Sequence, residues 1–219
     1  MKVLLRTLMP GVAALLLFQL ASAQVPQLSP FSADLQITST RSNAGPRDVT
    51  GQVYVGSGHI RVNMEGSGHK TALLTDFAAK TTDILLLDQQ MYIEQKIKQT
   101  SGPGPTTVAQ DLKPFDPDNP CASQPDVTCK KVGVEGVSGR TCDHWEVTDK
   151  QGRVANLWID QKLHFPVKVT SQDSTMLLSN IKEGQPDASL FVIPSGFEKL
   201  ETSPAKPPRA AGPPNPPHQ

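Results

Sequence analysis

Residues 51–64 read GQVYVGSGHIRVNM, and this stretch contains the pattern that decides the fold. Apolar side chains stand at every second position on either side of a Gly-Ser-Gly turn: Val53 and Val55 before it, and Ile60, Val62 and Met64 after it. Strict alternation is typical of a strand with one buried face, because successive side chains of a strand point to opposite sides. The stretch therefore predicts two antiparallel strands joined by a tight turn.

The same alternation recurs along much of the chain. Leu35 and Ile37 alternate with polar residues, and further runs occur at 70–77, 83–88, 91–97, 132–137, 140–148, 154–160, 165–170, 176–181 and 190–193. Gly, Asn, Asp or Pro separate the runs, and Ser138-Gly139 is a hairpin signal. The only helical candidate is a turn or two near 106–112. These runs predict a mainly-β domain with about eleven strands in one antiparallel sheet.

A flat sheet of this size would expose a whole face to water, so we expect the sheet to curve strongly onto itself. A closed barrel, a half-open barrel and a sandwich would each satisfy that requirement. Alternation alone does not choose among them.

The first residues have the order of a secretory signal. Lys2 and Arg6 precede an apolar run over residues 7–20, and Ala21-Ser22-Ala23 supplies the small residues that signal peptidase requires. The run is interrupted by Pro10 and is shorter than the roughly 20 residues of a spanning helix. We therefore expect residues 1–23 to be removed between Ala23 and Gln24, leaving a periplasmic or secreted protein that does not span the membrane.

The last residues have a different composition. Residues 201–219 read ETSPAKPPRAAGPPNPPHQ, in which nothing apolar is larger than alanine. Such a segment cannot bury enough surface to offset its ordering entropy, so it is predicted to be a disordered proline-rich tail. The expected organisation is thus a signal peptide at 1–23, a β-rich domain at 24–200 and a tail at 201–219.

Composition and motifs exclude several function classes. The whole chain has 21 basic and 21 acidic residues, and the signal carries two of the basic ones, so the mature chain is nearly neutral. Nothing in that balance favours nucleic-acid binding. The five histidines are scattered without metal-ligand spacing, and no nucleophile elbow or phosphate-binding glycine loop occurs. We expect no catalytic residues, no metal site, no cofactor and no enzymatic activity.

Three cysteines lie in the exported part, where disulfides are permitted. Cys121 and Cys129 bracket a polar loop, and a bridge between them is the favoured pairing, although Cys142 could replace either partner. By strand parity Cys142 faces away from Trp145 and Val147, which predicts a position on the outer surface. A reactive thiol beside His144 is the catalytic alternative, but no orienting acid is identifiable.

Several short motifs follow one another in an order known from another group of exported proteins. The first is the strand-turn-strand at 51–64, the second is the middle piece at 133–146, and the third is the series W-I-D, F-P-V-K-V, S-L-F and P-S-G-F within 157–200. Together they resemble an uncharacterised exported family related to the periplasmic lipoprotein-carrier (LolA/LolB-like) superfamily.

The resemblance implies an unclosed, half-open β-barrel around an apolar cavity that holds acyl chains. The sequence departs from the carriers in one respect: no amphipathic helix precedes Leu35, because the preceding segment contains Pro26 and Pro30. Arg61 lies on the polar face by parity, so no gating role is assigned to it.

Two functions remain open. The first is a soluble periplasmic carrier for lipid or lipoprotein acyl chains in the apolar concavity. Its inward residues would come from Leu35, Ile37, Val53, Val55, Ile60, Val62, Met64, Trp145, Val147, Val167 and Val169. The second is a non-catalytic envelope scaffold with a filled core, which meets a protein partner through an outer face or the proline-rich tail.

Overall fold

A computed structural model of the chain describes residues 28–39, 47–56, 58–97, 118–122 and 126–201. The predicted signal peptide, the helical candidate near 106–112 and the tail beyond residue 201 lie outside these ranges. Within them the structure is one sheet of twelve strands with a single short 3-10 helix.

The strands follow one another in two antiparallel series. The first comprises β1 (Phe31–Ser39), β2 (Arg47–Gly56), β3 (His59–Gly66), β4 (His69–Asp76), β5 (Thr81–Leu86) and β6 (Met91–Lys96). The second comprises β7 (Val127–Val137), β8 (Arg140–Asp149), β9 (Val154–Asp160), β10 (Phe165–Thr170) and β11 (Ser174–Glu183). The chain ends with the 3-10 helix η1 (Ala188–Phe191) and β12 (Glu198–Lys199).

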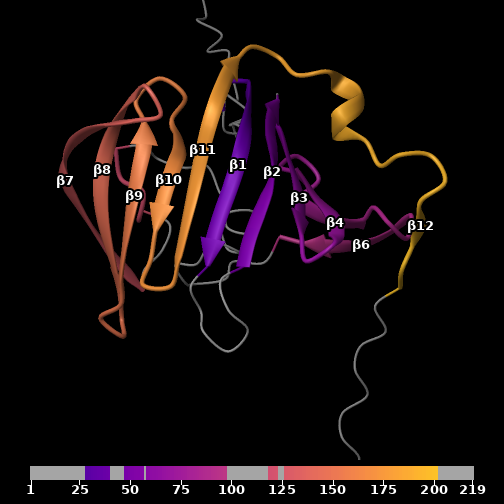
Figure 1. The fold of residues 1–219 in the computed structure, drawn as a ribbon, viewed down its shortest axis with the longest axis horizontal. Helices are drawn as coiled ribbons and strands as arrows, with labels where there is room; N and C mark the ends of the chain where they lie inside the picture. Colours follow the sequence, from indigo (N-terminus) through magenta and orange to yellow (C-terminus); the bar gives the residue numbers. More distant parts are fainter. Residues whose placement is uncertain (1–27, 40–46, 57, 98–117, 123–125, 202–219) are drawn as a thin grey trace, which may run out of the picture.

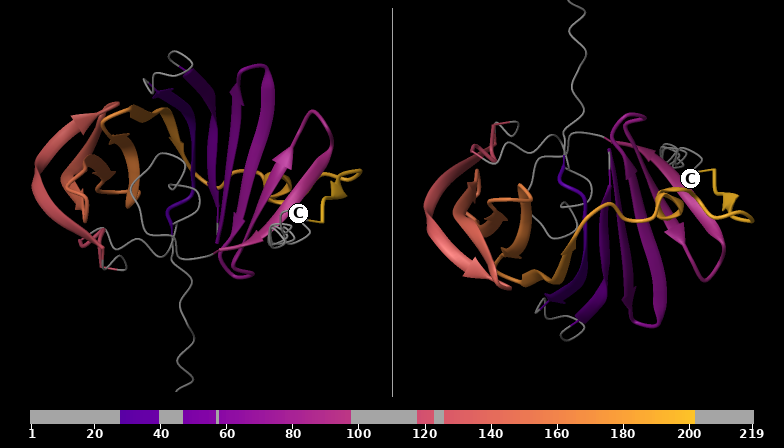
Figure 2. Two further views of the ribbon diagram at one scale, coloured as in Figure 1. Left: turned by 90° about the horizontal axis from the view of Figure 1, so that it is seen from below. Right: turned by 90° about the horizontal axis from the view of Figure 1, so that it is seen from above.

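Strand β1 joins the two series into one sheet, because it pairs with β2 on one side and with β11 on the other (Figure 1). The order across the sheet is β12-β6-β5-β4-β3-β2-β1-β11-β10-β9-β8-β7, so the two ends do not meet. Figure 2 shows β7 to β10 bent into an arc at one side, while β1 to β6 fan out at the other. The prediction of a mainly-β, strongly curved and open antiparallel sheet is confirmed.

Several elements differ from the sequence prediction. Strand β7 begins at Val127 rather than at residue 132, and β11 extends to Glu183. The strand predicted at 190–193 is wrong, since η1 occupies this region. The side chain of Asp187 accepts a hydrogen bond from the backbone N–H of Ser189 at 2.8 Å, which starts a helical turn in place of an extended run.

Cross-strand partners show which residues share a face of the sheet. One row passes from β1 to β6 through Ala33, Val53, Val62, Leu73, Ile84 and Ile93. A second row passes from β1 to β8 through Ile37, Met176, Val169, Leu157 and Trp145. Directly opposed residues point to the same side, so the two rows define one apolar face, here called the inner face.

The main core forms where strands of the two series meet. Phe31, Leu35, Val55, Ile60, Phe165, Val167 and Leu178 are among its buried members. The rings of Phe31 and Phe165 pack edge to face with centroids 5.2 Å apart. Burial of each such side chain contributes about 1.5–3 kcal/mol, so this cluster is the main stabilising element of the sheet.

The opposite, outer face is covered over part of its area by the C-terminal strap, which we define as residues 184–200 (Figure 1). Ala72, Leu74 and Leu85 are buried there, and Phe191, Ile193 and Phe197 of the strap pack against them. These three buried residues with their strap contacts form the outer apolar cluster.

Arg61 lies on this outer face, as parity predicted, but it is buried rather than solvated. Its guanidinium donates to the backbone carbonyl of Leu190 at 2.9 Å and to Oδ1 of Asn63 at 2.8 Å. Burial lowers the pKa of Arg61. Its position is therefore explained by attachment of the strap.

A buried ion pair fixes the turn between β9 and β10. Asp160, which is 1% exposed, accepts hydrogen bonds from Nε and Nη2 of Arg140 at 2.5 and 3.1 Å and from the backbone N–H of Leu163 at 2.7 Å. Arg140 also donates to Glu183 of β11 at 2.7 Å. Burial opposes ionisation of Asp160, but the hydrogen bonds from Arg140 and the turn outweigh it and lower the pKa of this carboxyl.

We predict that Asp160→Asn lowers the free energy of unfolding by about 3 kcal/mol at pH 7, because it leaves Arg140 without its buried counter-charge. The depressed pKa stabilises the fold above the ordinary aspartate pKa of about 3.9, and this contribution is lost as the pH falls through the folded value. The difference between variant and wild type should therefore shrink below about pH 4. Urea unfolding from pH 3 to 8 measures it, with the exposed Asp48→Asn as the matched control. A constant difference across this range would contradict the assignment.

Candidate functional site

Of the residues predicted to line the concavity, all but Val167, which stands at a bulge of β10, lie on the inner face, and most of them are packing residues. Leu35, Val53, Val55, Ile60, Trp145, Val147 and Val167 are buried. Ile37, Val62, Met64 and Val169 remain partly exposed and pack against the main core. The structure therefore brings all of these residues except Val167 onto one face and leaves only part of them accessible.

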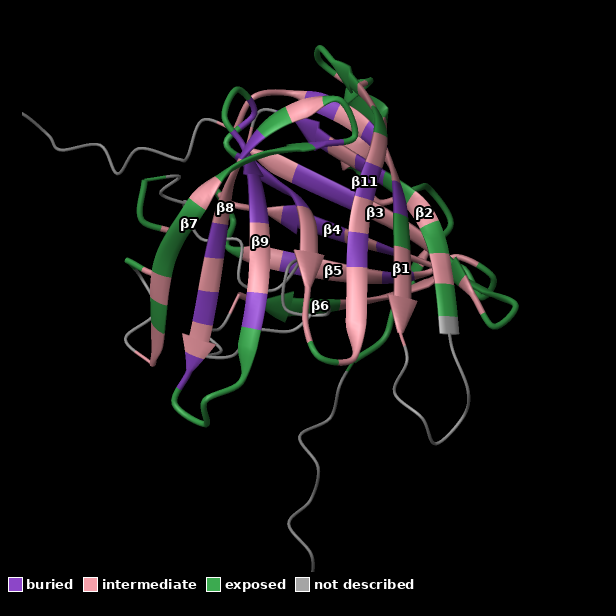
Figure 3. Cartoon of the chain, turned by 60° about the vertical axis from the view of Figure 1, so that its left-hand side comes forward, coloured by how far each residue is buried: buried purple, intermediate pink, exposed green. Residues whose placement is uncertain are grey.

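The accessible part of the inner face continues over β3 to β6. Val62 and Met64 of β3 are joined there by Leu73, Ile84, Leu86, Met91 and Ile93, all of them only partly buried. Figure 3 shows how β4, β5 and β6 pass behind β9, β11 and β1 in this curled sheet. We call these seven residues the open half of the inner face.

Sequence reasoning predicted the strands of this region and assigned Val62 and Met64 to the concavity, but it did not assign the inward residues of β4 to β6. Residues 83–88 read DILLLD, so apolar side chains stand at consecutive positions and parity does not separate the two faces. The structure separates them: Ile84 and Leu86 point to the inner face, whereas Leu85 is buried in the outer apolar cluster. The sequence did contain one signal: because both faces of this strand are apolar, each face is expected to be covered by another segment or by a ligand.

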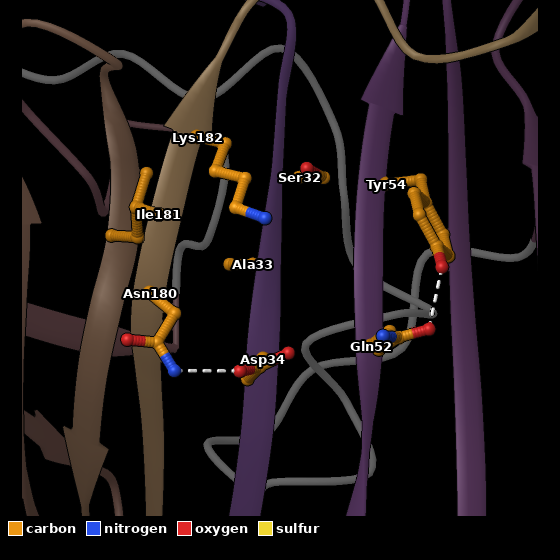
Figure 4. Close-up of a pocket in the computed structure, with 8 residues that line it drawn as sticks. All are labelled: Ser32, Ala33, Asp34, Gln52, Tyr54, Asn180, Ile181 and Lys182. Atoms are coloured by element: carbon orange, nitrogen blue, oxygen red, sulfur yellow. Dashed lines mark hydrogen bonds between the residues drawn. The ribbon is translucent and has the colours of Figure 1, made fainter.

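The outer face also carries a polar hollow over β11, β1 and β2, with a volume of about 570 Å³ (Figure 4). Its lining includes Ser32, Asp34, Gln52, Tyr54, Asn180 and Lys182. The Asn180 amide donates to Asp34 at 2.8 Å, and the Tyr54 hydroxyl donates to Gln52 at 2.5 Å. These groups can form hydrogen bonds, but they do not include a nucleophile paired with a base.

Cys121 and Cys129 form a disulfide, which is the pairing that the sequence favoured. The prediction that Cys142 lies on the outer surface is wrong, because Cys142 is fully buried in the main core. Its ladder partner is Asp160, whose carboxylate accepts a hydrogen bond from Arg140. Burial, followed by the nearby Asp160 charge, raises the pKa of the Cys142 thiol to about 11.

His144 is held by other groups and does not activate this thiol. Its Nδ1 contacts Glu135 at 2.8 Å, its Nε2 contacts Asn156 at 2.9 Å, and its ring stacks on Trp158 at 4.4 Å. The indole N–H of Trp158 donates to the same Glu135 carboxylate at 2.8 Å. Among the described residues, no three His, Cys, Asp or Glu side chains converge as metal ligands would.

The comparisons with known proteins are informative only at the level of the fold. No family model matches the chain, and no curated protein matches it. An uncharacterized conserved protein from Thermus thermophilus aligns over 78% of this chain and 90% of its own, with a TM-score of 0.51 and 11% identity. This similarity shows a shared fold.

Two further solved structures are similar at lower scores. MucB aligns over 80% of this chain with a TM-score of 0.48 and 16% identity, and the chain spans 60% of that protein. A LolA superfamily protein from Nitrosomonas europaea aligns over 75% of this chain and 90% of its own, with a TM-score of 0.40 and 12% identity. The open, curved antiparallel sheet is the architecture that the resemblance to lipoprotein carriers implied. In the described part of the chain, no helix has the length and apolarity needed to cross a bilayer.

We predict that Cys142 in the native protein resists alkylation by iodoacetamide at pH 8, since it is both buried and protonated there. Unfolding in guanidinium chloride without reductant should expose this thiol and allow one alkylation per chain, which mass spectrometry counts. Rapid alkylation of the native protein would contradict the buried position.

Proposed function

We propose that the mature chain is an extracytoplasmic binding protein that holds the acyl chains of a lipid or lipoprotein against the open half of the inner face. The observation that carries this proposal is the continuous, partly exposed apolar surface formed by β3 to β6. It lies on a sheet whose two ends do not meet, so the surface has an approach from solvent.

The chemistry of this surface favours an acyl chain. Its side chains are aliphatic or thioether groups, which offer dispersion contacts and no hydrogen bonds. Covering apolar surface stabilises a complex by about 25 cal/mol per Å², whereas a polar ligand would leave its own groups unpaired. Met64 and Met91 add flexible side chains that adapt to ligands of different shape.

The expected location supports the same proposal. The order of charged, apolar and small residues at the start of the chain is that of an export signal. The Cys121–Cys129 disulfide is of the kind that forms and persists in oxidising compartments. A periplasmic carrier would meet acyl chains of this kind.

Native mass spectrometry of the mature protein purified from an envelope extract tests the proposal. The expected spectrum contains lipid adducts that disappear on delipidation and return when phospholipid is added. If only the mass of the lipid-free protein is found under all of these conditions, the carrier proposal is wrong and the envelope scaffold with a filled core is favoured. Removal of residues 201–219 followed by partner pull-down tests the scaffold separately.

We predict that Ile84→Glu reduces the bound lipid at least tenfold, because it places a carboxylate in the floor of the open half and costs at least 1.4 kcal/mol of binding. Val154→Glu is the matched control, since Val154 is 43% exposed and its side chain lies outside the open half. Both variants should keep the circular dichroism of the wild type. Equal lipid loading of the two variants would show that the acyl chains bind elsewhere.

A further inference from the structure

The strap is attached to the edge of the sheet by a short contact. Its strand β12 runs parallel to β6 and pairs only with Met91 and Tyr92. Glu198 N–H donates to the carbonyl of Gln90 at 2.9 Å, and Leu200 N–H donates to the carbonyl of Tyr92 at 2.8 Å. Two main-chain hydrogen bonds at a sheet edge are a weak attachment, because each contributes only about 0.5–1.5 kcal/mol net.

The pairing ends two residues before like charges would meet. Glu198 lies opposite Met91 and Lys199 lies opposite Tyr92, so continuation of the same register would place Glu201 opposite Glu94. Directly opposed like charges destabilise a ladder. Among the residues that the structure describes, the edge of β6 beyond Tyr92 has no further strand partner.

Acidic groups gather at this point of the outer face. Asp83 of β5 pairs across the ladder with Glu94 of β6, and Asp76 of β4 is close enough to influence it. The basic groups beside them are Lys199, which donates to Glu94 at 3.0 Å, and the exposed Lys96, which lies two residues beyond Glu94 on the same face of β6. Negative charge is therefore in excess over the basic charge that the strap supplies.

Asp83 is incompletely satisfied. Its Oδ1 atom is buried and has no hydrogen-bond partner. Burial and then the neighbouring Glu94 raise the pKa of Asp83, whereas Lys199 opposes that effect and Asp76 adds to it. A buried carboxylate oxygen without a donor is costly, so a second basic group at this point would be favourable.

We propose that the β6 edge and the outer apolar cluster form a docking site for an extended polypeptide segment carrying a basic residue, and that the strap occupies this site in the free chain. The partner segment adds a strand to β6, as in other strand-addition complexes. Its apolar residues replace Phe191 and Phe197, and its basic residue replaces Glu201 opposite Glu94 and Asp83. This site is on the opposite face from the acyl-chain surface and does not depend on it.

The test uses the full mature chain and two synthetic peptides. One peptide has the sequence of residues 191–201, FVIPSGFEKLE, and the other carries the change Glu201→Lys. The protein carries Phe197→Ser, which removes one of the contacts of the strap with the outer apolar cluster and is expected to weaken the hold of the strap on the site. We expect the lysine peptide to bind at least tenfold more tightly than the glutamate peptide, with chemical-shift changes at the amides of residues 91–96.

Two variants separate charge recognition from strand addition. Asp83→Asn together with Glu94→Gln should remove the preference for lysine while weak binding of both peptides persists. Asp48→Asn, which changes an exposed acid elsewhere, should leave the preference unchanged. Equal affinity of the two peptides for the Phe197→Ser protein that keeps Asp83 and Glu94 would show that the basic residue is not the recognition element.

Occupancy of the site by the strap is tested by comparing peptide binding to proteins with an intact and with a weakened strap. The protein with an intact strap should bind the lysine peptide at least tenfold more weakly than the Phe197→Ser protein, because the tethered strap competes for the same edge. Absence of saturable binding to Phe197→Ser, or identical binding with and without the intact strap, would overturn the docking site.

Discussion

The pairing of β1 with β11 is the constraint on which the remaining structure depends. The ladder extends from Phe31 opposite Glu183 to Ser39 opposite Ser174, and it joins segments more than a hundred residues apart. Without it, the two antiparallel series would each end in a free edge and could not share a core. The contact is non-local, so its formation must offset a large loop-closure entropy, and the buried pair of Leu35 and Leu178 supplies part of that compensation.

The same joint produces the curvature. Strand β10 pairs with β11 only at its end, from Lys168 to Thr170, so the two strands diverge beyond that point. The turn between β7 and β8 approaches the part of β11 that β10 leaves unpaired, where Ser138 donates to the carbonyl of Leu178 at 2.8 Å. Arg140 then bridges Asp160 and Glu183, which fixes the bent series against β11. These polar contacts of Ser138 and Arg140 thus stabilise the curvature of β7 to β10 around the apolar core.

Alternation in the sequence was sufficient to predict most strands and the face to which their apolar residues point. It was insufficient wherever a segment remote in sequence covers the opposite face. Arg61 and Leu85 each stand at an outer position, and both are buried because the strap crosses them. Cys142 likewise stands on the face opposite Trp145, yet the bend of β7 to β10 turns that face into the core. The hydrogen bond of Asp187 that begins η1 is local, but a period-two pattern does not reveal it.

The distribution of side-chain volume explains why one half of the inner face is packed and the other half is open. Phe31, Phe165 and Trp145 are all buried on the side of β1 and β8 to β11, and the rings of Phe31 and Phe165 pack against each other in the main core. The inner residues of β3 to β6 are smaller aliphatic groups and methionines, spread over strands that fan outward (Figure 2). None of the seven residues of the open half is aromatic. An apolar surface that its own side chains do not fill is available for a ligand of the same polarity, and the curvature that packs one half therefore opens the other.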